Sequence, residues 1–205
     1  MKKIIQLVLL VAIVLLAWLL YRQFATPMEF QKMQSHREGV VIERLKDIRT
    51  AQRAFKQAYS RYTPSFDTLI NFVLHDSMTY QRAIGSEDDS VAVARGLVRR
   101  EIFKVAVKDT IYHGRGLTTQ DIENLRFIPF SNGKQFLMDA GALETGSKVV
   151  VQVFEAKAPY KEFLDEEDYH QELVNLIDQR KTINRYPGIK VGSMTEATND
   201  AGNWE

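Results

Sequence analysis

Cysteine is absent from this chain of 205 residues. Its absence excludes disulfide bonds, thiolate zinc sites and cysteine nucleophiles, although it does not identify the compartment in which the protein works. An excess of one charge is also missing, because 27 basic residues face 26 acidic residues and the formal net charge is +1. The chain as a whole therefore has no field that would attract the phosphates of a nucleic acid, and no nucleic-acid partner is predicted.

Residue patterns of known catalytic and metal sites are missing as well. No Gly-x-Ser-x-Gly sequence occurs that would hold a hydrolase nucleophile. The four histidines are scattered, and none has a second histidine at the spacing of a zinc-binding helix. We therefore predict no catalytic residue, no metal site and no cofactor, and we expect a protein that is not an enzyme. The alternative is an anchored enzyme or ligand-binding module whose polar residues converge only after folding. The histidines are His36, His75, His113 and His170.

One long apolar run is present, from Ile4 to Leu20, with no charged residue and only Gln6 as a polar one. At about 1.5 Å per helical residue, this run and its flanking residues approach the ~30 Å thickness of the hydrocarbon core of a bilayer. Trp18 and Tyr21 lie at its C-terminal end, where amphipathic rings favour the headgroup layer. We therefore predict a transmembrane anchor within residues 1–25 that contacts the lipid bilayer through residues 4–21.

The basic residues at the start of the chain predict its orientation. Lys2 and Lys3 precede the apolar run, and together with the N-terminal amine they favour a cytoplasmic N-terminus. We therefore predict a single-pass protein of the bacterial inner membrane whose C-terminal domain is periplasmic. The alternative is a cleaved secretory signal, because such signals also combine a basic start with an apolar middle.

A second helix is predicted from about Arg37 to Arg61, where apolar residues recur every three or four positions. Pro27, which precedes it, either kinks a continuing helix or occupies the first turn of a new one. Some of the apolar residues are also seven apart, so a coiled coil is the alternative to packing on the protein's own sheet. The predicted inward face consists of Val41, Leu45, Ile48, Ala51, Phe55, Ala58, Tyr59 and Tyr62.

The rest of the chain shows short helix signals and then strand signals. Asn132-Gly133, for example, supplies the positive φ angles of a tight hairpin turn. We therefore predict an α+β fold in which the long amphipathic helix packs on a small, mainly antiparallel sheet. The soluble domain is expected over residues 26–196 and a C-terminal tail over residues 197–205. The expected shorter helices lie at about 65–75, 87–95, 118–125 and 165–181, and the expected strands at about 103–107, 126–130, 134–138, 148–156 and 189–192.

The stretch IERLKDIRTAQRAFKQAYSRYTPSFDTL, from Ile42 to Leu69, resembles type IV pilins and pseudopilins where their helix leaves the membrane and ends at an aromatic-rich turn. The order of an apolar helix, an amphipathic helix and antiparallel strands is similar to that family as well. The resemblance implies a pilin-like order of elements and a role as a subunit of an envelope assembly.

A second resemblance covers most of the chain. The same helix segment, the FIPFSNGKQF stretch and the closing RYPGIKVGS and AGNWE are similar to an uncharacterised family of bacterial single-pass membrane-anchored proteins, which implies no activity. The function that we expect is that of a non-enzymatic periplasmic domain acting through protein–protein contact, as a pilin-like or envelope-assembly accessory subunit. Its partner would be an envelope protein or a second copy of the chain.

Three residues are candidates for binding that partner. Trp204 stands in a polar tail, where an indole ring needs a pocket either in its own domain or on a partner. Arg49 and Arg53 belong to a basic row on the helix predicted over residues 37–61. Such a row meets lipid headgroups, an acidic partner or only solvent. The other members of the row are Arg44, Lys56 and Arg61.

Overall fold

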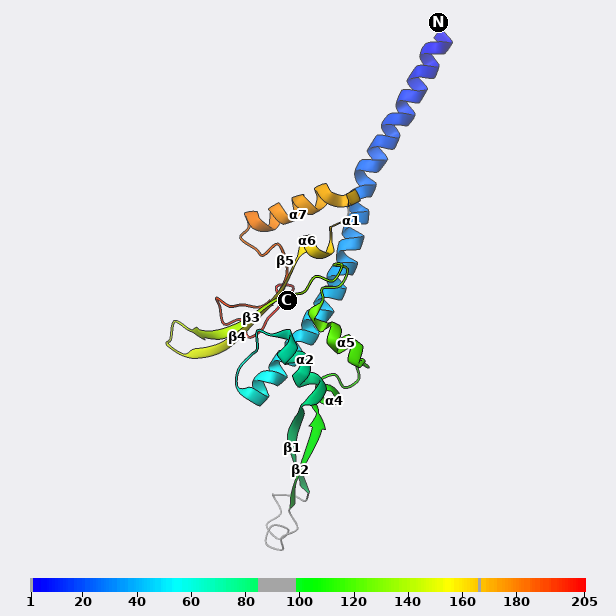
Figure 1. The fold of residues 1–205 in the computed structure, drawn as a ribbon. Coiled ribbons are helices and arrows are strands. Elements are labelled where there is room, and N and C mark those ends of the chain that lie inside the picture. The colour runs from blue at the N-terminus through cyan, green and yellow to red at the C-terminus, as the bar shows by residue number, and fades with distance from the viewer. Residues whose placement is uncertain (1, 85–98, 166) are drawn as a thin grey trace. The chain divides into compact units, whose positions relative to one another are not determined.

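The computed structural model describes residues 2–84, 99–165 and 167–205. The fold is α+β, as predicted, with a long apolar helix at the N-terminus and small antiparallel sheets (Figure 1). The helix predicted over residues 87–95 lies outside the described residues. Two compact units are present: unit 1 comprises Met1–Glu43, Ile128–Lys134 and Ala158–Ile189, and unit 2 comprises Arg44–Phe127, Gln135–Lys157 and Lys190–Glu205. The boundaries predicted after residues 25 and 196 stay predictions.

Helix α1 runs without interruption over Lys2–Tyr59, a length of 58 residues. It contains both helical segments predicted from the sequence, so Pro27 lies inside a continuing helix rather than at the start of a new one. Among the described residues, α1 is the one helix long and apolar enough to cross a membrane. It ends where Ser60 takes a left-handed backbone conformation (φ 57°) and donates its N–H to the carbonyl oxygen of Lys56.

In unit 2, the buried face of α1 follows the predicted periodicity over most of its length. Leu45, Ile48 and Ala51 are completely buried, and Phe55 is nearly so. Phe55 packs against Phe72 of α2 (Phe66–His75), with the ring centroids 5.2 Å apart. The helix therefore packs within its own unit, as expected from its apolar stripe.

The last turn of α1 departs from the prediction. Ala58 and Tyr59 are exposed rather than buried, because the helix ends here and Tyr62, just beyond it, enters the core instead. The turn is held by Gln52, whose amide nitrogen donates to the carbonyl oxygen of Thr63 (2.6 Å) and whose amide oxygen accepts from the N–H of Thr63 (3.1 Å). This completely buried amide ties α1 to the segment that follows it.

A two-stranded antiparallel ribbon follows α2. It consists of β1 (Ser77–Ile84) and β2 (Arg99–Ala106). The sequence-based prediction misses β1. The strand expected over residues 103–107 is confirmed as far as Ala106, because Val107 begins helix α4 (Val107–Ile111) and is completely buried.

The short helix expected over residues 118–125 is confirmed in outline. It comprises α5 (Thr119–Glu123) and the 3-10 turn η1 (Asn124–Arg126). Thr118 caps it, since its side chain accepts from the N–H of Asp121 while the Asp121 carboxylate accepts from the N–H of Thr118. The Asp121 carboxylate also accepts from the Thr118 hydroxyl (2.7 Å), and this bond, followed by the bond from the N–H of Thr118, lowers the pKa of Asp121.

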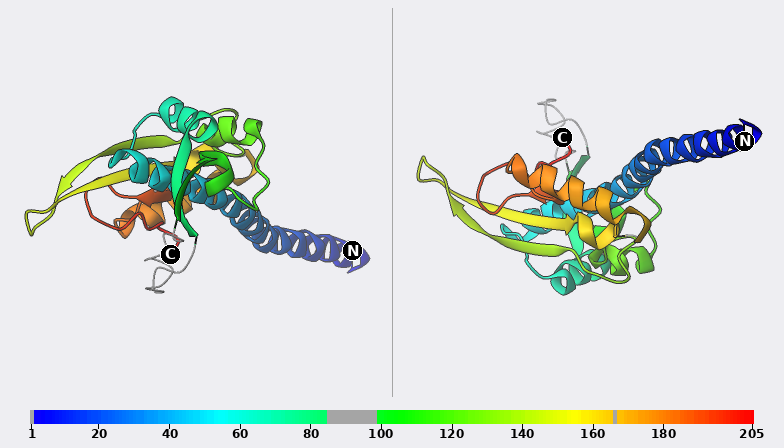
Figure 2. Two further views of the ribbon diagram at one scale, coloured as in Figure 1. Left: turned by 90° about the horizontal axis from the view of Figure 1, so that it is seen from below. Right: turned by 90° about the horizontal axis from the view of Figure 1, so that it is seen from above.

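The turn at Asn132-Gly133 exists, but no strand forms over residues 126–130, and of the strand predicted over residues 134–138 only Leu137 and Met138 belong to one, as the start of β3 (Leu137–Glu144). Both residues have positive φ angles, 49° and 84°. A single antiparallel bridge joins Phe127 to Gln135. The continuous hairpin lies further along the chain, where β3 pairs with β4 (Val150–Pro159), side by side in Figure 2.

The predicted strand at residues 189–192 is confirmed as β5 (Gly188–Gly192), which completes a sheet of order β3-β4-β5. Gly192 has a φ of 72°, and a Cβ at this position would overlap the carbonyl oxygen of Phe154. Only glycine satisfies both conditions without strain. The chain therefore turns away from the sheet at Gly192 and enters its C-terminal segment.

Unit 1 packs short elements around residues 30–37 of α1. Phe30 is buried, with its ring centroid 5.9 Å from that of Tyr169. Arg37 donates from Nη1 to the carbonyl oxygen of Phe163 (2.8 Å). The helix expected over residues 165–181 begins later than predicted, because a 3-10 turn comes first. The elements are α6 (Tyr160–Phe163), η2 (Glu167–Tyr169) and α7 (His170–Thr182).

Candidate functional site

Two arginines of α1 hold the C-terminal segment of unit 2. Arg49 donates from Nη1 to the Glu205 carboxylate (2.6 Å) and to the carbonyl oxygen of Asp200 (3.2 Å). Arg53 donates from Nε to the Asp200 carboxylate (3.1 Å) and from Nη2 to the carbonyl oxygen of Asn199 (2.9 Å). The segment predicted as a polar tail is therefore bound to the helix. We call the residues responsible, Arg49, Arg53, Tyr62, Asp200 and Glu205, the tail clamp.

Tyr62 provides the buried part of the tail clamp. Its hydroxyl donates to the Asp200 carboxylate, with oxygen–oxygen distances of 2.8 and 3.0 Å, and both residues are buried. Burial, the hydrogen bond to Asp200 and the negative charge of Asp200 raise the pKa of Tyr62 well above its ordinary value, and the charge of Arg53 offsets only part of this rise. Tyr62 therefore keeps its proton and remains a hydrogen-bond donor to Asp200.

Glu205 forms the outer part of the tail clamp. The hydrogen bond from Arg49 lowers the pKa of the Glu205 carboxyl group, and the slight burial of this group opposes the change. The side chain of Glu205 is 43% exposed, so water and salt screen its ion pair with Arg49. The outer contact is therefore weaker than the buried contact between Tyr62 and Asp200.

Trp204 lies half-buried beside the tail clamp. Its indole ring covers Gly202 so closely that a Cβ on Gly202 would overlap the ring. Gly202 in turn forms a single antiparallel bridge with Val191 of β5. Arg49 and Arg53 of α1 thus bind the C-terminal segment that contains Trp204. Binding of a partner by these three residues stays a prediction.

The basic row of α1 makes further contacts inside unit 2. Arg44 donates from Nη1 to the carbonyl oxygen of Asp121 (3.3 Å). Lys56 donates from Nζ to the Tyr62 hydroxyl (3.3 Å) and to the carbonyl oxygen of Gln152 (3.5 Å). Sequence reasoning offered lipid, an acidic partner or solvent for this row and missed the chain's own carbonyl oxygens, because contacts over such sequence separations leave no local pattern.

A cavity of about 210 Å³ adjoins the tail clamp in unit 2. Its walls come from the end of α1, from residues 151–154 of β4 and from the segment after β5. The Lys56 ammonium group and the Tyr62 hydroxyl line it together with Gln152, Ser193 and Asp200. Residues distant in the sequence thus form one polar cavity that no motif predicted.

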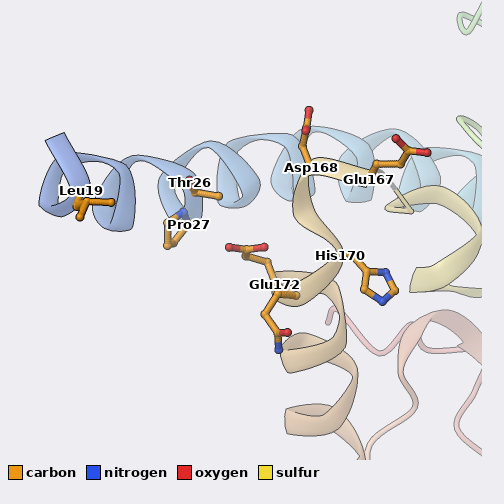
Figure 3. A pocket seen from close by; sticks show the side chains of 8 residues that line it. Leu19, Thr26, Pro27, Glu167, Asp168, His170 and Glu172 are labelled. Atoms are coloured by element: carbon orange, nitrogen blue, oxygen red, sulfur yellow. The ribbon is translucent and has the colours of Figure 1, made fainter. Parts of the chain in front are cut away.

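A second pocket, of about 620 Å³, lies in unit 1 beside residues 19–27 of α1. Leu19, Thr26 and Pro27 line it along the helix, and Figure 3 shows the carboxylate of Glu172 pointing toward Pro27. Glu167, Asp168 and His170 complete its polar side. The pocket is acidic and open, and its residues form no specific arrangement around a ligand.

The chemistry of catalytic centres is not apparent in the part of the chain that the structure describes. Across residues 2–84, 99–165 and 167–205, no group of three or more His, Asp or Glu side chains is placed to hold a metal ion. Burial is the largest cause of the raised pKa values of Tyr62, Tyr112 and Tyr160, and the pKa of Tyr160 rises to about 12. A tyrosine with a raised pKa is a poor nucleophile and a poor base at neutral pH.

The β1–β2 ribbon exposes apolar side chains that sequence reasoning also missed. Ile102 is 65% exposed and Phe103 is 44% exposed. Phe103 pairs with Tyr80 across the strands, and their rings stack with centroids 5.9 Å apart. The alternation of Met78 and Tyr80 with polar residues was the available signal for β1.

No family model matches this chain, and no curated protein or solved structure is significantly similar to it. The residues and geometry described above are therefore the basis for a functional proposal.

Proposed function

We propose that the chain is a single-pass, membrane-anchored, non-enzymatic protein that presents a folded α+β region for contact with another protein. The observation that carries the proposal is the exposure of the apolar side chains in Ile4–Leu20. Every large apolar side chain there is exposed, by 42% to 67%. Leaving such a side chain in water rather than burying it costs about 1.5–3 kcal/mol. A lipid bilayer would bury the whole stretch at once.

The cellular location follows from the ends of the anchor. Lys2 and Lys3 precede the apolar stretch, so the N-terminus is cytoplasmic and the region after the anchor is periplasmic in a bacterial inner membrane. The resemblance of Ile42–Leu69 to pilins and pseudopilins supports a pilin-like or envelope-assembly accessory role. The balanced charge supports a protein partner rather than a nucleic acid.

The surface that best fits such a contact is the β1–β2 ribbon. An isolated two-stranded ribbon is marginally stable by itself, and its outer strand edges can pair with an added strand. The Tyr80–Phe103 pair supplies an apolar face next to those edges. Among the side chains of these strands that the structure describes, Arg82 and Lys104 are basic and Glu101 is acidic. The partner that this chemistry favours is an extended, acidic segment of an envelope protein.

The anchor is tested by extracting membranes with alkaline carbonate and by adding protease to spheroplasts. We expect the full chain to remain in the membrane pellet and the region after residue 25 to be digested only from the periplasmic side. Recovery of a freely soluble protein that begins beyond Ala25 would support the cleaved signal and overturn the anchor.

The contact is tested by placing a photo-cross-linking amino acid at Phe103 in cells, with exposed Gln120 of α5 as the matched control. We expect a cross-linked species at position 103 whose partner peptide is rich in Asp and Glu. The charge reversal Lys104→Glu should weaken this cross-link. Identical products at positions 103 and 120, or an unchanged product with Lys104→Glu, would exclude the ribbon as the contact surface without affecting the anchor.

A further inference from the structure

Two aromatic rings pack beneath the cavity that adjoins the tail clamp. The Tyr62 and Phe154 rings are both buried, and their centroids lie 4.8 Å apart. Val151 and Val153 of β4 add apolar wall surface. Packed rings at the base of a polar cavity fix the positions of the polar groups above them, as a binding site requires.

The Lys56 ammonium group forms only long hydrogen bonds in this cavity. Its ammonium group has three N–H donors. Its two hydrogen bonds, of 3.3 Å to the Tyr62 hydroxyl and 3.5 Å to the Gln152 carbonyl oxygen, are longer than the usual range of about 2.7–3.2 Å. Nζ also lies 4.6 Å from the centroid of the Tyr62 ring. Within the described ranges, no carboxylate lies at ion-pair distance from Lys56.

Of the two carboxylates that line the cavity, Asp200 has other partners, and Glu196 forms no ion pair with Lys56. Asp200 accepts from Arg53 and from the Tyr62 hydroxyl. The raised pKa of Tyr62 keeps that hydroxyl protonated, so its proton points to Asp200 and its lone pair accepts from Lys56. The cavity therefore contains one half-buried ammonium group with capacity for an anionic oxygen.

We propose that this cavity binds a small organic carboxylate, with the carboxylate accepting hydrogen bonds from Lys56 and the body of the molecule lying against the apolar wall at Val151. A volume of about 210 Å³ lies below the roughly 300–1,000 Å³ of drug-sized sites, so the ligand is about as large as an amino acid. A monoanion fits better than phosphate, because a single ammonium group faces the cavity and Glu196 and Asp200 would repel a second negative charge. The site is independent of the anchor and of the β1–β2 ribbon.

The test uses the full chain in lipid nanodiscs with labelled valine methyl groups. Propionate is the probe, propionamide is its neutral counterpart and inorganic phosphate is the dianion. We expect propionate to shift the Val151 and Val153 signals in a saturable way, while the signal of Val191, which does not line the cavity, stays constant. Propionamide should bind at least about tenfold more weakly, the effect of a lost charged hydrogen bond, and phosphate should give no saturable shift.

The variant Lys56→Met removes the ammonium group and keeps most of the side-chain stem, and Lys32→Met on the same helix is its matched control. Lys56→Met should weaken propionate binding at least about tenfold, and Lys32→Met should leave it unchanged. Equal binding of propionate and propionamide by the natural chain, or no saturable shift with propionate, overturns the proposal even if Lys56→Met does not fold. Unchanged binding in a folded Lys56→Met variant overturns it as well.

Discussion

Helix α1 contains two apolar segments with opposite surroundings. In Ile4–Leu20 the large apolar side chains are all exposed, whereas Leu45, Ile48 and Ala51, further along the same helix, are completely buried. The difference lies in the arrangement of the apolar residues. The first segment is apolar on all sides, and the second carries one apolar stripe among charged residues.

This contrast shows that one continuous helix can combine two kinds of stabilisation. A helix that is apolar all round has no single side that faces a core, which is typical of a segment surrounded by lipid. A helix with one stripe requires a core on that side and water on the other. Four variants test the two kinds of stabilisation, in order of decreasing expected effect.

The largest effect is expected from charges in the first segment. Replacing both Leu10 and Val14 with arginine should release the chain from the membrane or prevent its insertion, because each arginine near the centre of a span costs about 2.5–3.5 kcal/mol. Thr50→Arg, on the exposed side of the second segment, is the matched control and should leave insertion unchanged. Carbonate extraction provides the measurement, and a double variant that stays in the pellet would contradict a lipid-embedded first segment.

The second effect concerns the core beneath the stripe. Ile48→Ala should destabilise unit 2 by about 2–5 kcal/mol, because it removes packed methyl groups from a completely buried site. Leu15→Ala, which removes similar groups from the anchor, should leave the unfolding of unit 2 unchanged. Urea denaturation in detergent, followed by near-ultraviolet circular dichroism, distinguishes the two variants. Equal midpoints would show that Ile48 contributes no packing energy.

The third effect concerns the end of the second segment. Gln52→Ala leaves both the carbonyl oxygen and the N–H of Thr63 without their buried partner, so the free energy of unfolding should fall by about 1–3 kcal/mol. Gln57→Ala, at an exposed position of the same helix, should change it by less than about 0.5 kcal/mol. The same denaturation experiment measures both variants. Similar losses of unfolding free energy in both would show that Gln52 stabilises the fold no more than an exposed glutamine does.

The smallest effect is expected at the outer part of the tail clamp. The lowered pKa of Glu205 means that its contact with Arg49 contributes above the usual glutamate pKa of 4.5 and is lost as the pH falls through the lowered value. Arg49→Gln should move this acid transition upward and cost less than about 1 kcal/mol at neutral pH. Trp204 fluorescence in a Trp18→Phe background reports the transition, with Arg61→Gln as the control. A transition at the same pH in Arg49→Gln would show that Arg49 does not hold Glu205 in solution.

Some elements could be predicted because their signals are local. The helices expected at about residues 65–75 and 118–125 are α2 and α5, and each begins at a capping residue, Ser65 and Thr118. The alternation at Phe103 and Val105 indicated β2. In each case residues within a few positions of one another determine the backbone, so a short window of sequence contains the necessary information.

Other features could not be predicted, because they depend on residues far apart in the chain. The Asn132-Gly133 turn favoured a hairpin around itself, yet β3 begins only at Leu137 and takes its pairing from β4. The contacts of the candidate site also join residues that are far apart in the chain. Arg49 and Arg53 were recognised as basic residues on a helix, but their hydrogen bonds to Asp200 and Glu205 span about three quarters of the sequence.

The sequence by itself determined the long apolar stretch, the amphipathic stripe that follows it and the α+β composition, because hydrophobic periodicity acts through neighbouring residues. Only the tertiary structure decided that the C-terminal segment lies on α1, that Tyr62 shares Asp200 with Arg53 and that Lys56 faces a cavity. Those outcomes depend on which distant groups satisfy one another's hydrogen bonds and charges once the chain is packed, and no local pattern encodes that choice.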